Sequence, residues 1–356
     1  MFDNDLKLAR KNMVARLHAT TPEREVQIEQ KMAEIRSRHC SSARDQLTAD
    51  YVKMMKKSMM STDFDNDKAN RILFVAGESN SGKSQLVEHT LGTDPFFDVY
   101  ENEFEVSVSH LLRSTAPAPC TLRNLGIKIL QDLRYPVRKD IREGHVWPIV
   151  REQLAGREIA FLVIDEAQRA MKIKDEEELQ KLSDNLIALV EMQEWPMRLI
   201  LLGVDPLLTL RERDKQMRNR SQKVELGPVS MDRSDRVATW IEDIVTNHAQ
   251  FSIGSLPLSD VAKRLVHAND GNVGSIITLI RSAVRETLEG NRSEVYVSDF
   301  AQAYHKATHC RKEENVFDAT EWMATPKGLA KLIGKEEPEQ AASSDLVPLK
   351  AGDRPR

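Results

Sequence analysis

The sequence has few cysteines, few aromatic residues and no long apolar run, and its basic residues do not outnumber its acidic ones. Only 5% of its 356 residues are aromatic, whereas 30% are charged. This composition argues against a β-sandwich, which needs many aromatic and β-branched residues, and favours a soluble, helix-rich protein. The length predicts two to three domains, which can fold without disulfide or metal staples.

The three cysteines are Cys40, Cys120 and Cys310, too widely spaced for a Cys-x-x-Cys ligand pair. A sparse and odd count is typical of a reducing compartment, so isolated thiols are the simplest interpretation. The first residues, MFDNDLKLAR, are acidic where a signal peptide is basic, and the apolar runs are far shorter than the roughly 20 residues that span a bilayer. We therefore expect a cytoplasmic protein with no membrane partner.

The charge balance limits how the chain can bind nucleic acid. Fifty-one basic residues are offset by 55 acidic ones, which gives a formal net charge of −4. A basic shell that binds nucleic acid non-specifically is therefore excluded. Local basic patches are not excluded, and two occur, at 113–142 and 211–223.

Four regions follow one another along the chain. Residues 1–65 show helical periodicity, and residues 66–227 alternate short apolar runs with helical patterns, which indicates a parallel sheet with crossover helices. Residues 228–310 show helical patterns only. Residues 311–356 end in acids, prolines and alanines without periodicity, so we expect a largely disordered tail. Five strands are expected, at 72–76, about 97–106, 159–164, 198–203 and 223–226.

A glycine-containing loop follows the first of these strands and precedes a helical stretch that begins at Gln85. The loop is Gly77-Glu78-Ser79-Asn80-Ser81-Gly82-Lys83-Ser84, which matches the pattern G-x-x-x-x-G-K-S. Its glycines let backbone N–H groups point at phosphate oxygens, and the helix N-terminus adds partial positive charge. Lys83 is expected to reach the β- and γ-phosphates, and Ser84 to bind Mg²⁺. The sequence therefore predicts a site for ATP and Mg²⁺.

A pair of carboxylates ends the third strand. The run FLVI leads into Asp165 and Glu166, which places both acids at the edge of the sheet that also carries the phosphate loop. Asp165 can hold Mg²⁺ through water, and Glu166 can act as the base that orients the attacking water. A strand between loop and acid, together with this glutamate, is the pattern of additional-strand P-loop ATPases. The fold class is therefore α/β, a P-loop NTPase with a five-stranded parallel sheet, flanking helices, N-terminal helices and a C-terminal helical lid.

The fourth strand and the segment after it carry less certain signals. The strand ends at Val204, where such ATPases place a polar sensor, so this position is a departure. The segment 211–223 contains six basic and two acidic residues, a local charge of +4. Three interpretations remain open: a solvated helical face, a contact to a nucleic-acid backbone, and an arginine that acts on the nucleotide of a neighbouring subunit, for which Arg220 is our choice.

Taken together, these motifs resemble the AAA+ ATPases of DNA transposition, the TniB and TnsC family, over about residues 45–305. The resemblance rests on GESNSGKS, VIDEAQ, LLGVDP and QMRNRSQKVEL. It rests also on the Pro-x-Pro-x-Thr segment at Pro117, Pro119 and Thr121, and on Asp270-Gly-Asn-Val-Gly-Ser-Ile in the helical region. The lid sensor, usually an arginine in AAA+ proteins, is replaced here by Gly274 and Ser275, so Arg281 or Arg285 would have to substitute for it.

The resemblance implies an ATP-dependent regulator that assembles as a homo-oligomer, a filament or ring, on double-stranded DNA. Such a protein recruits and stimulates a transposase and acts with a target-selection protein, while ATP hydrolysis, here expected to be slow, takes the assembly apart. By the family's pattern, Arg220 is the arginine that acts in trans. In the family, the segment after the second strand faces the DNA, and the candidate contacts there are Arg113, Arg123, Lys128, Arg138 and Lys139.

Two alternative functions remain at this stage. One is a related AAA+ ATPase with a protein partner, of the secretion or loader type, although the sequence lacks the apolar and cell-wall-binding segments that a secretion role favours. The other is a signalling NTPase that binds nucleotide without productive turnover. Intact Lys83, Asp165 and Glu166 argue against a purely binding module.

Overall fold

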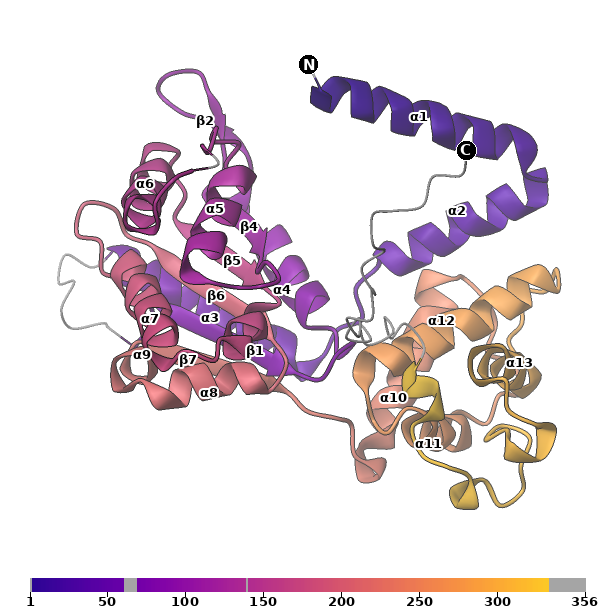
Figure 1. Ribbon diagram of the computed structural model, residues 1–356. Helices are drawn as coiled ribbons and strands as arrows, with labels where there is room; N and C mark the ends of the chain where they lie inside the picture. The colour runs from indigo at the N-terminus through magenta and orange to yellow at the C-terminus, as the bar shows by residue number, and fades with distance from the viewer. Residues whose placement is uncertain (1, 61–68, 139, 333–356) are drawn as a thin grey trace, which may run out of the picture.

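The computed structural model describes residues 2–60, 69–138 and 140–332, which form an α/β lobe and a helical lobe side by side (Figure 1). The α/β lobe has seven strands: β1 (Ile72–Gly77), β2 (Tyr100–Glu101), β3 (Ser107–Val108), β4 (Leu111–Thr115), β5 (Phe161–Asp165), β6 (Arg198–Gly203) and β7 (Ser221–Leu226). Its helices are α3 (Ala43–Met60), α4 (Lys83–Gly92), η1 (Pro95–Phe97), α5 (Leu122–Asp132), α6 (Glu143–Gly156), η2 (Ala167–Lys172), α7 (Glu176–Val190), α8 (Pro206–Arg213) and α9 (Lys215–Asn219).

Five of the strands form one parallel sheet in the order β4-β5-β6-β1-β7. Strand β6 lies between β1, which precedes the phosphate loop, and β5, which ends in Asp165. This is the inserted strand that the sequence predicts. The carboxyl ends of all five strands meet at one edge, so loops far apart in sequence come together there.

The three inner strands, β1, β5 and β6, are nearly all apolar because helices cover both faces of the sheet. Leu73 and Val75 of β1 pack with α3 and α4 on one face. Ile72 and Phe74, which alternate with them, pack with α5, α6, α7 and α8 on the other. The predicted α/β architecture with a five-stranded parallel sheet is confirmed.

The predicted position of the second strand is wrong. Residues 97–106 do not enter the sheet; Tyr100–Glu101 form β2, which pairs antiparallel with β3 just after this stretch. The sheet strand is β4, which begins at Leu111. Residues 98–105 carry acids at four positions, and these cannot be buried in a sheet. Strand β4 contains polar residues too, but it is an edge strand paired only with β5, where polar side chains can reach solvent.

The helical lobe contains α10 (Ser234–Glu242), the π-helix η4 (Asp243–His248), α11 (Leu258–Ala268), α12 (Val273–Glu289) and α13 (Val297–Thr308), with the short turn η3 (Met231–Arg233) before them. Two further helices, α1 (Phe2–Thr20) and α2 (Glu23–Ser37), precede the α/β lobe in the chain. Met32 and Ile35 of α2 are buried in the core of the helical lobe, whereas α3 packs on the sheet. The division of the chain at residues 65, 227 and 310 stays a prediction.

The first part of the expected tail, residues 311–332, is folded. Residues 311–332 form the short helices η5 (Lys312–Glu314), η6 (Trp322–Ala324) and η7 (Leu329–Leu332). Val316, Phe317 and Trp322 are buried in the core of the helical lobe, and these apolar residues hold the segment in place. The rest of the predicted tail, 333–356, lies outside the described residues.

Two further expectations concern thiols and membranes. Cys40, Cys120 and Cys310 are all free and buried. Every helix of the described residues is too short or too polar to cross a bilayer.

Candidate nucleotide site

The phosphate loop, residues 77–84, connects the end of β1 to the start of α4. A Cβ atom on Gly77 would lie 2.7 Å from the carbonyl oxygen of Leu226, and Gly82 has a φ of +89°, which L-residues rarely adopt. Gly82 is also the N-cap of α4, and none of the described side chains caps this helix end. The first N–H groups of α4 are therefore available to an anion, as in other phosphate-binding loops.

Lys83, the first residue of α4, folds its side chain into this loop. Its Nζ donates hydrogen bonds to the carbonyl oxygens of Gly77, at 2.9 Å, and Glu78, at 2.7 Å. Burial lowers the pKa of Lys83 from its ordinary value, and nearby carboxylates, with Asp165 foremost, oppose this shift. The ammonium group is thus held at the loop by carbonyl oxygens and lies within the field of the acids opposite.

Asp165, at the end of β5, meets the start of α4. The hydroxyl of Ser84 donates to Oδ2 of Asp165 at 2.8 Å. A carboxylate and a hydroxyl oxygen this close together fit Mg²⁺, a hard cation that prefers oxygen ligands and keeps several of its waters. Both residues border a hollow of about 380 Å³ between α4, β4 and α5.

Glu166 follows with a φ of +56°, a strained conformation for a residue with a side chain. Its N–H donates to Oδ1 of Asp165 at 2.7 Å. This turn separates the two carboxylates, so Asp165 faces Ser84 while Glu166 faces the residues of η2. Strain of this kind is concentrated at functional sites.

Gln168 holds the Glu166 side chain and was missed by reasoning from the sequence. Its Nε2 donates to Oε2 of Glu166 at 2.9 Å, and its Oε1 accepts from the N–H of Val204 at 3.4 Å. A Cβ atom on Gly203 would lie 2.4 Å from the same Oε1, so glycine leaves the room that the amide needs. Gln168 thus supplies, from the turn after β5, the polar group that Val204 lacks at the end of β6. The sequence did offer a signal, because Gln168 is the last residue of the VIDEAQ motif on which the family resemblance rests.

The helical lobe contacts the phosphate loop through the start of α12. A Cβ atom on Gly274 would lie 1.8 Å from the carbonyl oxygen of Asn80, so only glycine permits this approach. The amide of Asn272 donates to the carbonyl oxygen of Ser79 at 3.0 Å. Both residues belong to the Asp270-Gly-Asn-Val-Gly sequence, which therefore packs directly on the loop.

Lys331 is a second contact that the sequence did not reveal. From η7, its Nζ lies 2.6 Å from Oε2 of Glu78 in the loop and 3.7 Å from Oδ2 of Asp270. This ion pair connects the end of the described chain with the phosphate loop.

Neither arginine proposed as a lid sensor faces the loop. Arg281 is buried and donates to the carbonyl oxygen of Arg38 at 2.8 Å, and Arg285 forms ion pairs with Glu29 and Glu289. Both side chains point toward α2 and the connection after it, because they lie on the face of α12 that packs there. Neither contacts the loop in this structure, and slow hydrolysis, which is expected if neither replaces the sensor, stays a prediction.

The predicted nucleotide-binding residues therefore lie together. They are the loop residues Gly77, Glu78, Ser79, Asn80, Ser81, Gly82, Lys83 and Ser84, the next residue of α4, Gln85, and the acid Asp165. Glu166, the predicted base, adjoins them.

Arg220 lies at the opposite edge of the sheet, directly before β7. Its guanidinium forms an ion pair with Glu191, and its side chain is 13% exposed. Strands β1 and β7 run parallel, with Ile72 paired to Ser221. The length of β1, about 17 Å at 3.3 Å per residue, therefore separates Arg220 from its own phosphate loop.

Four of the five other basic residues of the segment 211–223 also pair with acids of the same chain. Arg211 and Arg218 each lie near Glu212, Arg213 lies near Glu176, and Lys223 lies near Glu225. These pairs favour the first of the three interpretations, a solvated and charged helical face, for most of the segment 211–223.

The residues predicted to contact DNA do not form one surface. Arg113 and Lys128 line the hollow beside Ser84, where they pair with Glu88 and Asp132. The Nε of Arg123 donates to the carbonyl oxygen of Ile141 at 3.0 Å. Arg138 is exposed on the connection between α5 and α6, and Lys139 lies outside the described residues.

Comparison with known protein families agrees with the nucleotide site described above. The sequence model of the family described as Bacterial TniB protein matches residues 46–231, more than half of the chain. None of the curated proteins matches it.

Similar solved structures come from archaea. The ORC2 protein of Aeropyrum pernix, solved as ADPNP–ADP complexes, shares 13% identity and a TM-score of 0.50, over 78% of this chain and 73% of that one. The A. pernix ORC1 protein in complex with DNA shares 16% identity over 74% and 67%, with a TM-score of 0.49. Cdc6p from Pyrobaculum aerophilum shares 12% identity over 70% of this chain and 65% of its own length, with a TM-score of 0.47. At these identities the likeness to ORC2 supports the fold alone.

Proposed function

The chain belongs to the bacterial TniB family, and from this premise we propose that it is an ATP-dependent regulator of DNA transposition. It assembles as a homo-oligomer on duplex DNA when ATP is bound, recruits and stimulates a transposase, and works with a target-selection protein. Slow hydrolysis of ATP then takes the assembly apart. The observation that carries the proposal is the meeting of Lys83, Ser84, Asp165 and Glu166 at one edge of the sheet, within the residues that match the family.

The phosphate loop holds the triphosphate. The uncapped N–H groups at the start of α4 and the ammonium group of Lys83 supply positive charge to the phosphate oxygens. Ser84 and Asp165 hold Mg²⁺, which when bound stabilises negative charge on the phosphates. Asn272 and Gly274 of the helical lobe contact the loop directly, so nucleotide binding and the position of the helical lobe are coupled.

Glu166 is the general base. It orients the attacking water and accepts its proton, a contribution of about 10²–10⁴-fold in many enzymes. The amide of Gln168 positions its carboxylate, and Arg169, with Nε 3.7 Å from Oε2 of Glu166, adds a nearby positive charge. Because both residues follow Glu166 in the same turn, the base is held by its own local structure.

Arg220 acts on the nucleotide of a neighbouring subunit. Its place at the far edge of the sheet keeps it from its own phosphate loop, since about 17 Å exceeds the length of an arginine side chain. A neighbour whose loop docks against this edge brings the two together, and the ion pair with Glu191 must then open. Efficient hydrolysis therefore depends on assembly.

Contact with DNA is made from the connection between α5 and α6. Arg138 is exposed there, whereas Arg113 and Lys128 already have acidic partners beside the nucleotide site. Binding through phosphate contacts weakens steeply with salt, because counterions are released from the DNA.

Filter binding of labelled duplex DNA tests this proposal. We expect retention with a slowly hydrolysed ATP analogue and little with ADP, and a steep loss of binding as salt rises. Arg138→Ala should reduce the slope of log affinity against log salt by about 1. Arg236→Ala, on the exposed surface of the helical lobe, is the matched control and should leave the slope unchanged. Equal binding with ADP, or an affinity independent of salt, would contradict the proposal.

A further inference from the structure

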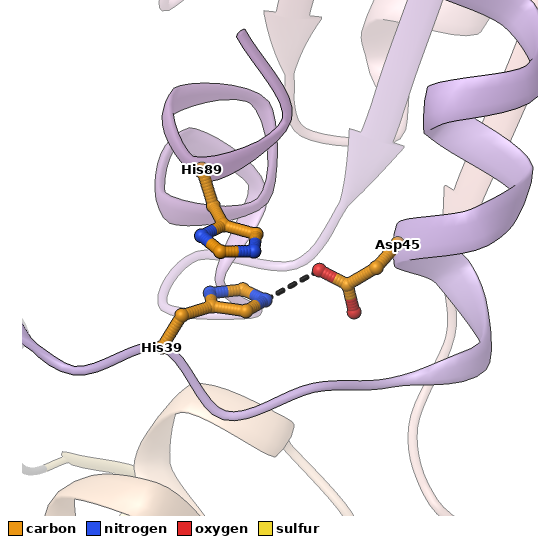
Figure 2. A group of neighbouring side chains, drawn as sticks. All are labelled: His39, Asp45 and His89. Atoms are coloured by element: carbon orange, nitrogen blue, oxygen red, sulfur yellow. Dashed lines mark hydrogen bonds and ion pairs between the residues drawn. The ribbon is translucent and has the colours of Figure 1, made fainter. Parts of the chain in front are cut away.

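A second cluster of side chains with ligand chemistry lies on the side of α4 away from the acids of the nucleotide site. It consists of His39, in the connection between α2 and α3, Asp45, in the first turn of α3, and His89, on α4 (Figure 2). The three residues come from segments up to 50 positions apart (89 − 39), and none of them is buried. The cluster has no part in the function proposed above.

The ligand atoms of this cluster converge. The rings of His39 and His89 are stacked, with centroids 3.8 Å apart and planes inclined by 8°. Nε2 of His39 forms a hydrogen bond with Oδ1 of Asp45. Figure 2 shows one nitrogen of each ring on the side that faces the Asp45 carboxylate. One ligand atom from each residue lies within 4.8 Å of the other two.

These separations are close to those of a filled zinc site. Zinc–ligand bonds of 2.0–2.2 Å in a tetrahedron place neighbouring ligand atoms about 3.4 Å apart. The stacked rings must rotate slightly so that their nitrogen lone pairs converge, and the bond between His39 and Asp45 must lengthen to admit the ion. Both changes are small rotations of side chains that are only partly buried, with 18% of the His39 side chain and 19% of the Asp45 side chain exposed.

The surroundings support the cluster as a ligand set. Oδ2 of Asp45 accepts from the backbone N–H of Ser42 at 2.5 Å and from its hydroxyl at 2.8 Å, which fixes the carboxylate and leaves Oδ1 directed at His39. Partners of this kind orient metal ligands in many proteins.

A neighbouring group of similar composition is unsuited to a cation. Cys40, Asp243 and His248 also lie within 4.8 Å of one another. The buried guanidinium of Arg281, however, is hydrogen-bonded to Cys40 and would repel a metal ion there. Burial raises the pKa of Cys40 to about 11, so the thiolate that binds metal is scarce. The two groups can be told apart by mutation: a metal ion held by the first group depends on His89, whereas an ion held by the second depends on Cys40.

We propose that His39, Asp45 and His89 bind one Zn²⁺ ion, with water completing the coordination. Two imidazoles and one carboxylate are a donor set that zinc accepts, and three protein ligands leave one open position. The ion would clamp the connection between α2 and α3 to α4, the helix whose first residue is Lys83. It would thereby fix the N-terminal helices relative to the phosphate loop.

Zinc titration of the full-length, untagged protein, stripped with a chelator beforehand, tests the proposal against a chromogenic indicator. We expect one ion per chain, with affinity reduced about tenfold or more by His39→Ala and by His89→Ala. Asp45→Asn should weaken binding likewise while keeping an oxygen that can accept from Ser42, so it serves if the alanine variants fold poorly. His145→Ala, at an exposed histidine of α6, and Cys40→Ser are the controls and should bind zinc as the unaltered protein does.

Two results would overturn the proposal. One is zinc binding that is absent from the unaltered protein or unchanged in His89→Ala. The other is loss of binding in Cys40→Ser, which would assign the ion to the neighbouring group.

Co²⁺ gives an independent readout: we expect a cobalt complex without the charge-transfer band of a thiolate, and that band would exclude a site made only of histidine and aspartate. Zinc should also raise the Tm of the unaltered protein but not that of His89→Ala, and an equal rise in both would count against it.

Discussion

Removal of the Gln168 amide should slow ATP hydrolysis without weakening ATP binding. Gln168→Ala deletes the hydrogen bond to Glu166 and the contact with the Val204 N–H, and it touches neither Lys83 nor Ser84. The base stays in place but loses the group that positions its carboxylate.

The size of this effect can be worked out from the contact. A hydrogen bond to a charged group contributes about 1.5–3 kcal/mol, which corresponds to about 10- to 150-fold in rate if it is fully expressed in the transition state. The Glu166 side chain is 45% exposed, so water replaces part of what is lost. We therefore expect the lower end, a fall of about tenfold in kcat. Gln168→Glu should fall further, because it places a second negative charge beside Glu166.

The assay is phosphate release at saturating ATP in the presence of duplex DNA, with the affinity of a fluorescent nucleotide measured in parallel. Gln153→Ala on α6, which removes a glutamine amide far from the site, is the matched control and should leave kcat unchanged. A normal kcat in Gln168→Ala would refute the positioning role. So would a loss of nucleotide affinity as large as the loss of kcat, because the residue would then be supporting the loop rather than the base.

Three further predictions concern the base, the arginine and the thiols. Glu166→Gln should bind ATP but turn it over slowly and leave long-lived complexes with DNA, seen as slower dissociation in a chase; faster dissociation would contradict its role as the base. Arg220→Ala should lower DNA-stimulated hydrolysis by about 10³-fold or more, as for other arginines that act in trans. Nucleotide binding by the Arg220→Ala monomer should stay normal, and its collapse would place the arginine in its own site. Burial raises the pKa of Cys40 and Cys120 to about 11 from an ordinary value of 9.0, so both are protonated in the folded protein and should react slowly with a thiol reagent at pH 8. Because the folded protein holds these protons more tightly, their contribution to stability is present below pH 9 and is lost as the pH rises toward 11, which denaturant titrations at several pH values can measure.

Strands β1, β5 and β6 were predictable because they are buried on both faces and therefore nearly all apolar. Strand β4 was misplaced because an edge strand tolerates polar residues, so its pattern is no stronger than that of the acidic stretch before it. Lys83 and Asp165 could be identified because phosphate and magnesium demand fixed residue types at fixed spacing.

The remaining contacts depend on tertiary packing, which local pattern does not encode. Gln168 acts through the turn that Glu166 starts, and although it closes the VIDEAQ motif, the motif alone does not show which groups its amide contacts. Lys331 pairs with Glu78, which lies 253 positions earlier in the chain (331 − 78), with most of the α/β lobe and the helical lobe between them. The meeting of His39 with His89 likewise requires that the N-terminal connection pass beside α4, and no spacing rule anticipates it.

Electron microscopy of the protein with duplex DNA tests most directly whether bound ATP drives assembly. Samples with a slowly hydrolysed ATP analogue should contain filaments or rings on DNA, and samples with ADP should not. Lys83→Ala should form none with either nucleotide, because the loop then lacks the ammonium group that holds the phosphates. Identical assemblies with ADP, or in Lys83→Ala, would contradict the claim that nucleotide binding at this loop controls assembly on DNA.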